Sequence, residues 1–428
     1  MNALQYKDLL INFTTEFAPI WNDKGTRSQQ AVTFWRPSTS SDALSNFISL
    51  GDVAIGDYHN INHRKIVAVV SEADNVNGTA LRTPDDFELV WRHSGKRVRA
   101  EVSIWRPIPP RGYVALGMVC GVGNEKPPRN TVRCVRADLV VGAHPDQPIW
   151  NDKGSGAHND FSAWNISPPE AAPGETYLAA GTFVGATGYA RPTQQTTTHA
   201  LRLDLPLHTR HLPPLPPVLD PQQRALWDAA HAPHVCELPW FAVKDPELTP
   251  IEQLSNCPTY RLERNDQYIL VSTGHNPSPI SKTFNWTVYR GEVDNLSAGL
   301  RALTGIGWAS GWSSGHPLKI CARLDLDFTH TATSAKGWGQ TSLFEVIAYV
   351  PANKSIGAYL IRSEYKLLRT DGSQLGATLK YANGENVHFS ELLPPQPATP
   401  EQLPTAPDTA EATLEITPHD GIDDTFVS

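Results

Sequence analysis

Apolar and polar residues alternate in short runs along the first half of the chain, and one arrangement recurs three times. Each copy contains two tryptophans fourteen positions apart, and an apolar–hydroxyl–apolar step leads to the second of them. The pairs are Trp21 and Trp35, Trp91 and Trp105, and Trp150 and Trp164. Period-two alternation interrupted by Gly, Pro, Asn and Asp is typical of β-strands. A repeat of roughly sixty residues in three copies therefore predicts three similar β units.

The turns inside the repeat support this interpretation. Each copy has a glycine four residues after its first tryptophan, and residues 22–25 and 151–154 have the same sequence, Asn-Asp-Lys-Gly. These residue types favour tight hairpins because they tolerate a left-handed backbone. Four strands in each of three copies predict three small sheets about a pseudo-threefold axis, a β-prism over residues 1–207. We expect the six tryptophans to fill its core, because a buried indole supplies a large apolar area.

Two phrases in the repeat resemble a known family. Residues 34–37 read FWRP and residues 104–117 read IWRPIPPRGYVALG, whereas residues 164–167 read WNIS and lack the Arg-Pro pair. The first two resemble the repeat of the vacuolar protein sorting protein 62 family, which is related to the β-prism modules of multivesicular-body and lipid-transfer proteins. The resemblance covers about residues 15–207. It implies a module that binds membranes or partner proteins, and not an enzyme.

The second half of the chain alternates as well, but the repeat is absent and the strands are longer. Residues 284–288, 320–328 and 344–350 each place apolar side chains at every second position. Such alternation predicts an antiparallel β domain over residues 236–392, with one face of each strand buried. The proline-rich residues 208–235 predict a stiff linker between the two domains.

The second domain resembles the central region of aerolysin-type β-pore-forming toxins, as in bacterial insecticidal proteins. The resemblance rests on the long strands, the Gly/Ser/Thr-rich residues 297–315 and 329–342, and the phrase Val-Pro-Ala-Asn-Lys at 350–354. It implies an elongated, aerolysin-like β domain that oligomerises and inserts a hairpin as part of a barrel. An ordinary antiparallel sandwich with Gly/Ser-rich loops fits the same pattern. We expect the inserting hairpin within residues 281–342, with strands at 284–290 and 320–328 side by side. The candidate inserting residues are Phe284, Trp286, Val288, Trp308, Trp312, Leu324, Leu326 and Phe328.

The charge of the chain lies at its C-terminal end. Residues 391–428 contain eight acidic residues and no Lys or Arg, and the rest of the chain holds 36 acidic and 36 basic residues. The acidic, proline-rich tail at 393–428 is therefore expected to be disordered. The neutral remainder argues against a nucleic-acid partner, because a nucleic-acid groove needs clustered Lys and Arg.

Motifs for catalysis or metal binding are weak. Gly311–Gly315 matches G-x-S-x-G, but no strand–helix–strand pattern surrounds it. His59 and His63 lie in a predicted loop, and the five cysteines lack the spacing of metal ligands. We therefore expect a protein without enzymatic activity, cofactor or metal.

Two functions fit these patterns. The first is a bacterial toxin or toxin component of the insecticidal kind, whose prism binds a membrane or a protein or glycan receptor, and whose second domain forms a homo-oligomer on the membrane, with or without a second protein. No secretion signal is visible near Met1, so such a protein would be made in the cytoplasm and would act at the target membrane after release. The second is an intracellular adaptor that binds lipid headgroups or sorting partners. The candidate binding residues are Asn22, Asp23, Lys24, Arg92, His93, Asn151, Asp152 and Lys153.

Overall fold

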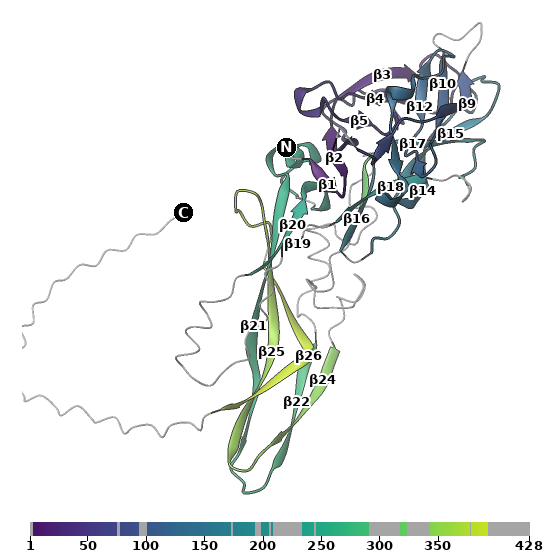
Figure 1. The fold of residues 1–428 in the computed structure, drawn as a ribbon. Helices are drawn as coiled ribbons and strands as arrows, with labels where there is room; N and C mark the ends of the chain where they lie inside the picture. Colours follow the sequence, from purple (N-terminus) through teal and green to yellow (C-terminus); the bar gives the residue numbers. More distant parts are fainter. Residues whose placement is uncertain are drawn as a thin grey trace, which may run out of the picture.

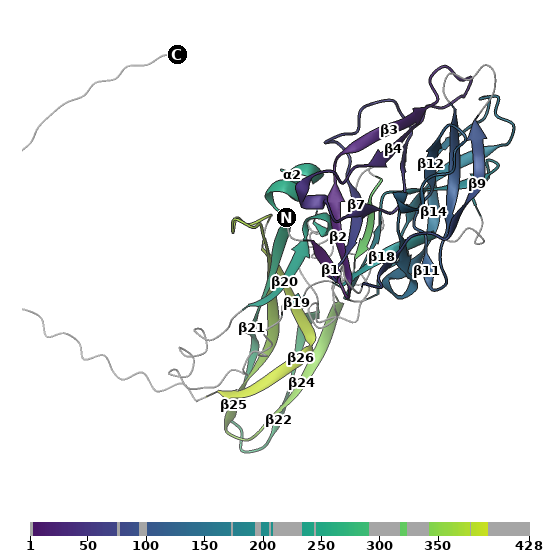
Figure 2. The same ribbon diagram turned by 45° about the horizontal axis from the view of Figure 1, so that its top comes forward.

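The computed structural model describes residues 3–74, 78–93, 101–172, 174–192, 198–204, 207–208, 233–243, 245–290, 317–322, 342–376 and 378–392. Almost all of the elements in this part are β-strands. The strands form a domain of short sheets and, leading away from it, a domain of long strands (Figure 1 and Figure 2). In the part described, no helix is both long enough and apolar enough to cross a membrane. The all-β prediction is confirmed.

The three repeats form three equivalent sheets. Copy 1 contributes β3 (Phe17–Asn22), β4 (Thr33–Pro37) and β6 (Val53–Ile55). Copy 2 contributes β9 (Asp86–His93), β10 (Val102–Ile108) and β12 (Val119–Val122). Copy 3 contributes β14 (Val140–Asn151), β15 (Phe161–Ser167) and β17 (Phe183–Thr187). The first tryptophans occupy the same register position in all three sheets, beside an irregularity of the ladder.

A second set of three sheets completes the prism. In each, the last strand of the copy lies between a strand that precedes the copy and a short strand from within it. The sets are β2 (Leu9–Thr14), β7 (Val67–Glu72) and β5 (Ile48–Ser49); β8 (Leu81–Arg82), β13 (Cys134–Arg136) and β11 (Tyr113–Val114); and β14, β18 (Thr198–Asp204) and β16 (Glu175–Ala179). The strand β1 (Leu4–Tyr6) extends the first of these sheets. The predicted three-fold prism is thus present.

The first tryptophans of the copies meet in the middle of the prism. The ring centroids of Trp21, Trp91 and Trp150 lie 5.8–6.4 Å apart, and every pair meets edge to face. Trp150 Nε1 donates to Asp23 Oδ2 over 3.1 Å, and Trp91 Nε1 donates to Asp152 Oδ2 over the same distance. Each of these hydrogen bonds joins one copy to another, so the copies are held together by polar as well as apolar contacts.

The second tryptophans are buried as well, as the sequence predicts. Trp35, Trp105 and Trp164 are between 5% and 8% exposed. The indole N–H groups of Trp105 and Trp164 donate to the hydroxyls of Ser103 and Ser162, at 2.9 and 2.8 Å. In copies 2 and 3, the hydroxyl residue of the apolar–hydroxyl–apolar step therefore accepts a hydrogen bond from a buried tryptophan two positions further along the strand.

An ion-pair cluster at the prism surface makes stability depend on acid pH. Arg136 donates to both carboxylate oxygens of Asp8, at 2.6 and 2.8 Å, and to Asp138 at 2.6 Å. The hydrogen bond from Arg136 lowers the pKa of both carboxyls, to about 2 for Asp138. Since an unfolded Asp titrates near pH 3.9, this stabilisation is complete above that pH and is lost as the pH falls towards 2.

We therefore expect the melting temperature to fall between about pH 4 and pH 2, and to fall less steeply in Arg136→Gln. The measurement is thermal unfolding followed by circular dichroism across this pH range. Arg111→Gln, which removes an exposed arginine of the same prism, is the matched control. An identical acid dependence in Arg136→Gln and Arg111→Gln would contradict the assignment.

The second domain is a long antiparallel sheet. Its strand order is β19 (Leu207–His208), β20 (His234–Pro239), β21 (Thr259–Asn276), β25 (Lys354–Leu368) and β26 (Leu379–Leu392). The short helix α2 (Pro250–Asn256) lies between β20 and β21 and begins with a capping box at Thr249. Two strands thus lie partly within the predicted linker, while 209–232 and the tail at 393–428 lie outside the described residues.

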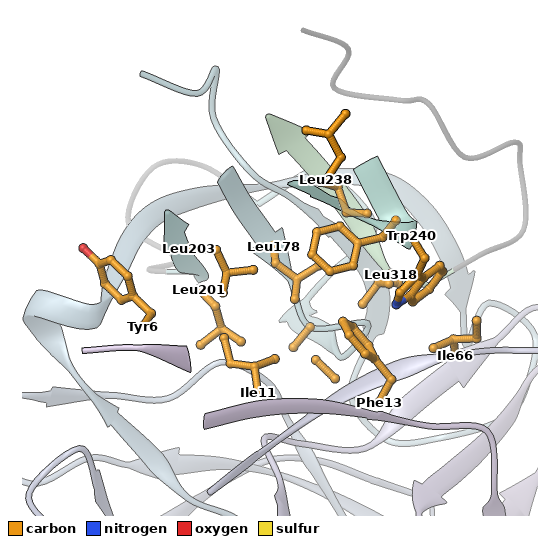
Figure 3. Close-up of a cluster of buried hydrophobic side chains, with 14 of the residues drawn as sticks. Tyr6, Ile11, Phe13, Ile66, Leu178, Leu201, Leu203, Leu238, Trp240 and Leu318 are labelled. Atoms are coloured by element: carbon orange, nitrogen blue, oxygen red, sulfur yellow. The ribbon is translucent and has the colours of Figure 1, made fainter. Parts of the chain in front are cut away.

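The two domains share one hydrophobic core. Phe13 of β2 packs edge to face on Trp240, with 5.2 Å between ring centroids, and Leu238 of β20 belongs to the same cluster. Figure 3 shows these side chains converging with Leu178, from β16 of the prism, and Leu318. The end of the long domain that carries β20 and Trp240 therefore packs directly against the prism.

Candidate functional site

One end of the prism carries the turns that the sequence proposes as binding loops. Asp23 Oδ1 accepts a hydrogen bond from the backbone N–H of Val32, and Asp152 Oδ1 accepts one from that of Phe161, both at 2.9 Å. The two aspartates are 2% and 3% exposed, and His93, which lies at the same register position in copy 2, is 3% exposed. Burial raises the pKa of Asp152.

These three residues therefore correct the expectation that they face a partner. Asp23 and Asp152 fasten the turns and accept the tryptophan N–H groups, and the ring of His93 lies 5.7 Å from that of Trp21. Their side chains stabilise the prism from inside.

The other predicted loop residues divide into turn-forming and outward-facing groups. Asn22 Oδ1 accepts from the N–H of Lys24 at 3.1 Å, and Asn151 Oδ1 accepts from that of Lys153 at 3.2 Å. Lys24, Lys153 and Arg92 are exposed. The exposed charged residues of the predicted set are therefore all basic.

Two tyrosines on the same end escaped the sequence-based prediction. Tyr58 donates to Asp23 Oδ1 at 2.8 Å and lies under the ammonium of Lys24, 4.7 Å from the ring centroid. Tyr189 follows β17 and donates to Asp160 at 2.9 Å. Burial, and then the hydrogen bond to Asp23, raises the pKa of Tyr58 to about 12. The sequence signal is a tyrosine three positions after β6 and two after β17.

The long domain carries a two-stranded sheet of its own. The strands β22 (Lys282–Arg290) and β24 (Ser342–Val350) pair along their whole length, from Lys282 opposite Val350 to Arg290 opposite Ser342. Phe284 and Trp286 face the long sheet together with Val346, Ala348 and Val350, against side chains such as Ile269, Leu360 and Ile356. Thr283, Asn285, Thr287, Glu345, Ile347 and Tyr349 are exposed on the other face. The two strands are not consecutive in the sequence, but they form one antiparallel pair, which we call the β22–β24 hairpin.

One buried amide anchors the β22–β24 hairpin at the end where it connects to β21 and β25. Asn276 Nδ2 donates to the carbonyls of Ile280, Val350 and Pro351, at 2.8, 2.9 and 3.0 Å. The Val-Pro-Ala-Asn-Lys phrase forms the facing turn, in which Asn353 has a φ of 55° and donates its N–H to the Ser278 carbonyl. The phrase therefore joins β24 to β25 at the far end of the domain.

A short strand between β22 and β24 in sequence leaves the long domain altogether. β23 (Lys319–Ala322) pairs with β16 of the prism, with Cys321 opposite Tyr177. Lys319 forms an ion pair with Asp146, and Cys321 Sγ accepts the N–H of Ala171 at 3.3 Å. The sequence predicted that 320–328 would lie alongside 284–290, but β22 pairs with β24 instead. This corrects that prediction.

Several sequence-predicted residues cannot be placed. Trp308, Trp312, Leu324, Leu326, Phe328 and the Gly311–Gly315 motif lie outside the described residues, as does the side chain of Val288. Of the predicted inserting residues, the structure brings together Phe284 and Trp286, whose rings stack with centroids 6.1 Å apart. Within the described ranges, no group of three or more His, Cys, Asp or Glu side chains has the arrangement of a metal site.

Comparison with known proteins finds similar solved structures and one matching family. The chain is similar to GNIP1Aa from Chromobacterium piscinae, with 23% identity and a TM-score of 0.39 over 46% of this chain. It spans only 37% of the length of that protein. It is also similar to Cry35Ab1, with 8% identity and a TM-score of 0.30 over 91% of this chain and 90% of the other. No curated protein matches the chain.

The family match concerns the prism. Residues 3–215 match the family described as Vacuolar protein sorting-associated protein 62. They contain both Trp-Arg-Pro phrases and all three copies of the repeat. The N-terminal half of this chain, folded as a three-fold β-prism, therefore resembles the vacuolar protein sorting-associated protein 62 family.

Proposed function

We propose that this protein is a toxin or toxin component that binds a target membrane through its prism and inserts the β22–β24 hairpin as part of an oligomeric β-barrel. The observation that carries the proposal is the two-faced character of this hairpin. One face packs apolar side chains on the long sheet, and the other presents mainly polar side chains to solvent.

The dimensions and pattern of the hairpin suit this role. A membrane-spanning β-strand needs about 9–11 tilted residues, and β22 and β24 contain nine each. In a barrel wall, apolar side chains face lipid and the alternate ones face the lumen. Phe284, Trp286 and Val346 would face lipid, while Thr283 and Asn285 would face water. Ile347 and Tyr349 interrupt the polar face.

The contacts that hold the β22–β24 hairpin on the long sheet also support its detachment. Among the described residues, β22 and β24 form a sheet separate from β19–β26, so side-chain packing, and not a shared ladder of hydrogen bonds, holds them on the long strands. Gly274 of β21 lies under this contact, and a Cβ there would come within 3.1 Å of Trp286 and 3.2 Å of Phe284. Detachment thus leaves the main sheet paired.

Recognition is assigned to the loop end of the prism. Lys24, Lys153 and Arg92 are exposed there beside Tyr58 and Tyr189, which are 40% and 39% exposed. Basic and aromatic side chains together suit an anionic membrane surface or an acidic receptor, because tyrosine offers both an apolar ring and a hydroxyl.

A disulfide between the hairpin and the long sheet tests the proposal. The Cγ atom of Phe284 lies 3.2 Å from the position of a Cβ at residue 274, so Gly274→Cys with Phe284→Cys brings two thiols within bonding reach. The oxidised double variant is expected to release no dye from loaded liposomes or midgut membrane vesicles that the wild type permeabilises. Reduction is expected to restore the release.

The matched control keeps a disulfide but leaves the hairpin free. Gln267 on β21 and Arg362 on β25 lie directly opposite each other, so cysteines at these positions join two strands of the main sheet. Dye release by this variant is expected to be the same in both redox states. Release by the oxidised 274–284 variant at the wild-type rate would rule out this hairpin. Absence of release by the wild type would favour the adaptor function.

A further inference from the structure

The three-fold repeat allows equivalent positions to be compared. One buried aspartate of copy 1 has no acidic counterpart in copy 2. In copy 1, Arg36 donates through Nε and a terminal nitrogen to the two carboxylate oxygens of Asp52, both at 2.9 Å. The same side chain donates to the carbonyl of Cys120 in copy 2, at 2.7 Å. Asp52 is completely buried. The arginine and the aspartate therefore link copies 1 and 2.

In copy 2 the arginine is present but the acid is not. Trp35 lies opposite Val53 and Trp105 lies opposite Val119, so Asp52 and Met118 occupy equivalent positions. Arg106, the counterpart of Arg36, pairs instead with Glu88 at 2.9 Å, where both side chains are about half exposed. The equivalent space between copies 2 and 3 therefore lacks a carboxylate.

That space is a cavity of about 220 Å³. Its apolar wall is formed by Leu116, Met118, Ile166, Phe183 and Val184, and Arg106 lines it as well. A drug-sized molecule needs a pocket of roughly 300–1,000 Å³, so the occupant is smaller. The volume suits a single sugar ring or a compact organic acid.

Two polar side chains in the wall have atoms without partners. Thr198 is 5% exposed, and its hydroxyl makes no hydrogen bond. The imidazole of His199 bonds to the backbone of Ala115, while its Nδ1 is buried without a partner. Buried polar groups normally have partners, and burial lowers the pKa of His199, so its free nitrogen accepts a hydrogen bond near neutral pH.

We propose that this cavity binds an acidic monosaccharide, a uronic-acid type of sugar, free or at the end of a glycan. Its carboxylate would stand in for the acid that copy 1 supplies through Asp52 and would take Arg106 from Glu88. Its hydroxyls would pair with Thr198 and with Nδ1 of His199, and the ring face would lie on Phe183 and Met118. This inference goes beyond the proposed function and does not depend on it.

Calorimetric titration of the full chain with glucuronate, glucose and butyrate tests the site. Glucuronate is expected to bind saturably, while glucose lacks the carboxylate and butyrate lacks the hydroxyls. Glucose and butyrate are each expected to bind at least roughly tenfold more weakly than glucuronate, because a lost charge-assisted or buried hydrogen bond costs about 1.5 kcal/mol or more. Equal binding of all three, or no binding of glucuronate, would overturn the proposal.

Variants place the binding in this cavity. Met118→Asp copies the acid of copy 1 and is expected to abolish glucuronate binding, while Met118→Leu is the control and is expected to retain it. Arg106→Gln and Thr198→Val are each expected to weaken binding at least about tenfold at an unchanged melting temperature, which keeps the test decisive should Met118→Asp fold poorly. Wild-type affinity in Arg106→Gln and Thr198→Val would refute the site.

Discussion

Trp150→Ala is expected to lower the free energy of unfolding by about 3–5 kcal/mol, as a large-to-small change in a core that cannot collapse around it. Trp150 is fully buried and meets Trp21, Trp91 and Phe34 edge to face. Its loss also removes the hydrogen bond from the indole to Asp23. The measurement is equilibrium denaturation in urea, followed by tryptophan fluorescence.

Trp150→Phe separates the two contributions. Phenylalanine keeps most of the ring contacts but leaves the buried Asp23 carboxylate without the indole donor, which is expected to cost about 1–3 kcal/mol. A free energy of unfolding in Trp150→Ala equal to that of the wild type would contradict the packing of the three tryptophans at the axis.

Arg36→Ala is expected to cost a similar amount, about 3–5 kcal/mol, because it leaves the carboxylate of Asp52 buried without its cation. The equivalent change in copy 2, Arg106→Ala, is the matched control. It removes an exposed pair with Glu88 and is expected to cost less than about 1 kcal/mol. Both values come from denaturation of the full chain under identical conditions.

Copy 2 also suggests how to rescue the first variant. If the cost of Arg36→Ala comes from the unpaired carboxylate, adding Asp52→Met, the residue found at the equivalent position 118, should recover much of the lost stability, since apolar replacement of both partners of a buried pair is often near neutral. A double variant less stable than Arg36→Ala would show that the guanidinium stabilises the prism by another route.

Much of the prism could be predicted from the sequence because short stretches of sequence determine its strands and turns. The alternation around each tryptophan sets which face of a strand is buried, and its repetition shows that three sheets are alike. The roles of Asp23 and Asp152 could not be predicted this way. Residues of this type in a turn are normally solvated, and the tryptophan N–H groups that they accept come from other copies, 127 and 61 positions away.

The long domain shows the same limit more sharply. The alternation at 284–288 and 344–350 predicted two strands with one buried face, and these strands are β22 and β24. Alternation at 320–328 predicted a strand as well, but period two reveals only that a face is buried and not which edge the strand joins. β23 pairs with β16, at least 140 positions earlier, where Leu318 and Ile320 enter the shared core.

The ring of contacts at the prism axis makes the three copies a single cooperative unit. Trp150 of copy 3 donates a hydrogen bond to Asp23 of copy 1, and Trp91 of copy 2 donates one to Asp152 of copy 3. The ring of Trp21 of copy 1 packs against that of His93 of copy 2. A fragment that lacks any one copy leaves the tryptophans of the other two facing water. Folding intermediates with one or two finished copies are therefore costly, and the prism should melt in one all-or-none transition.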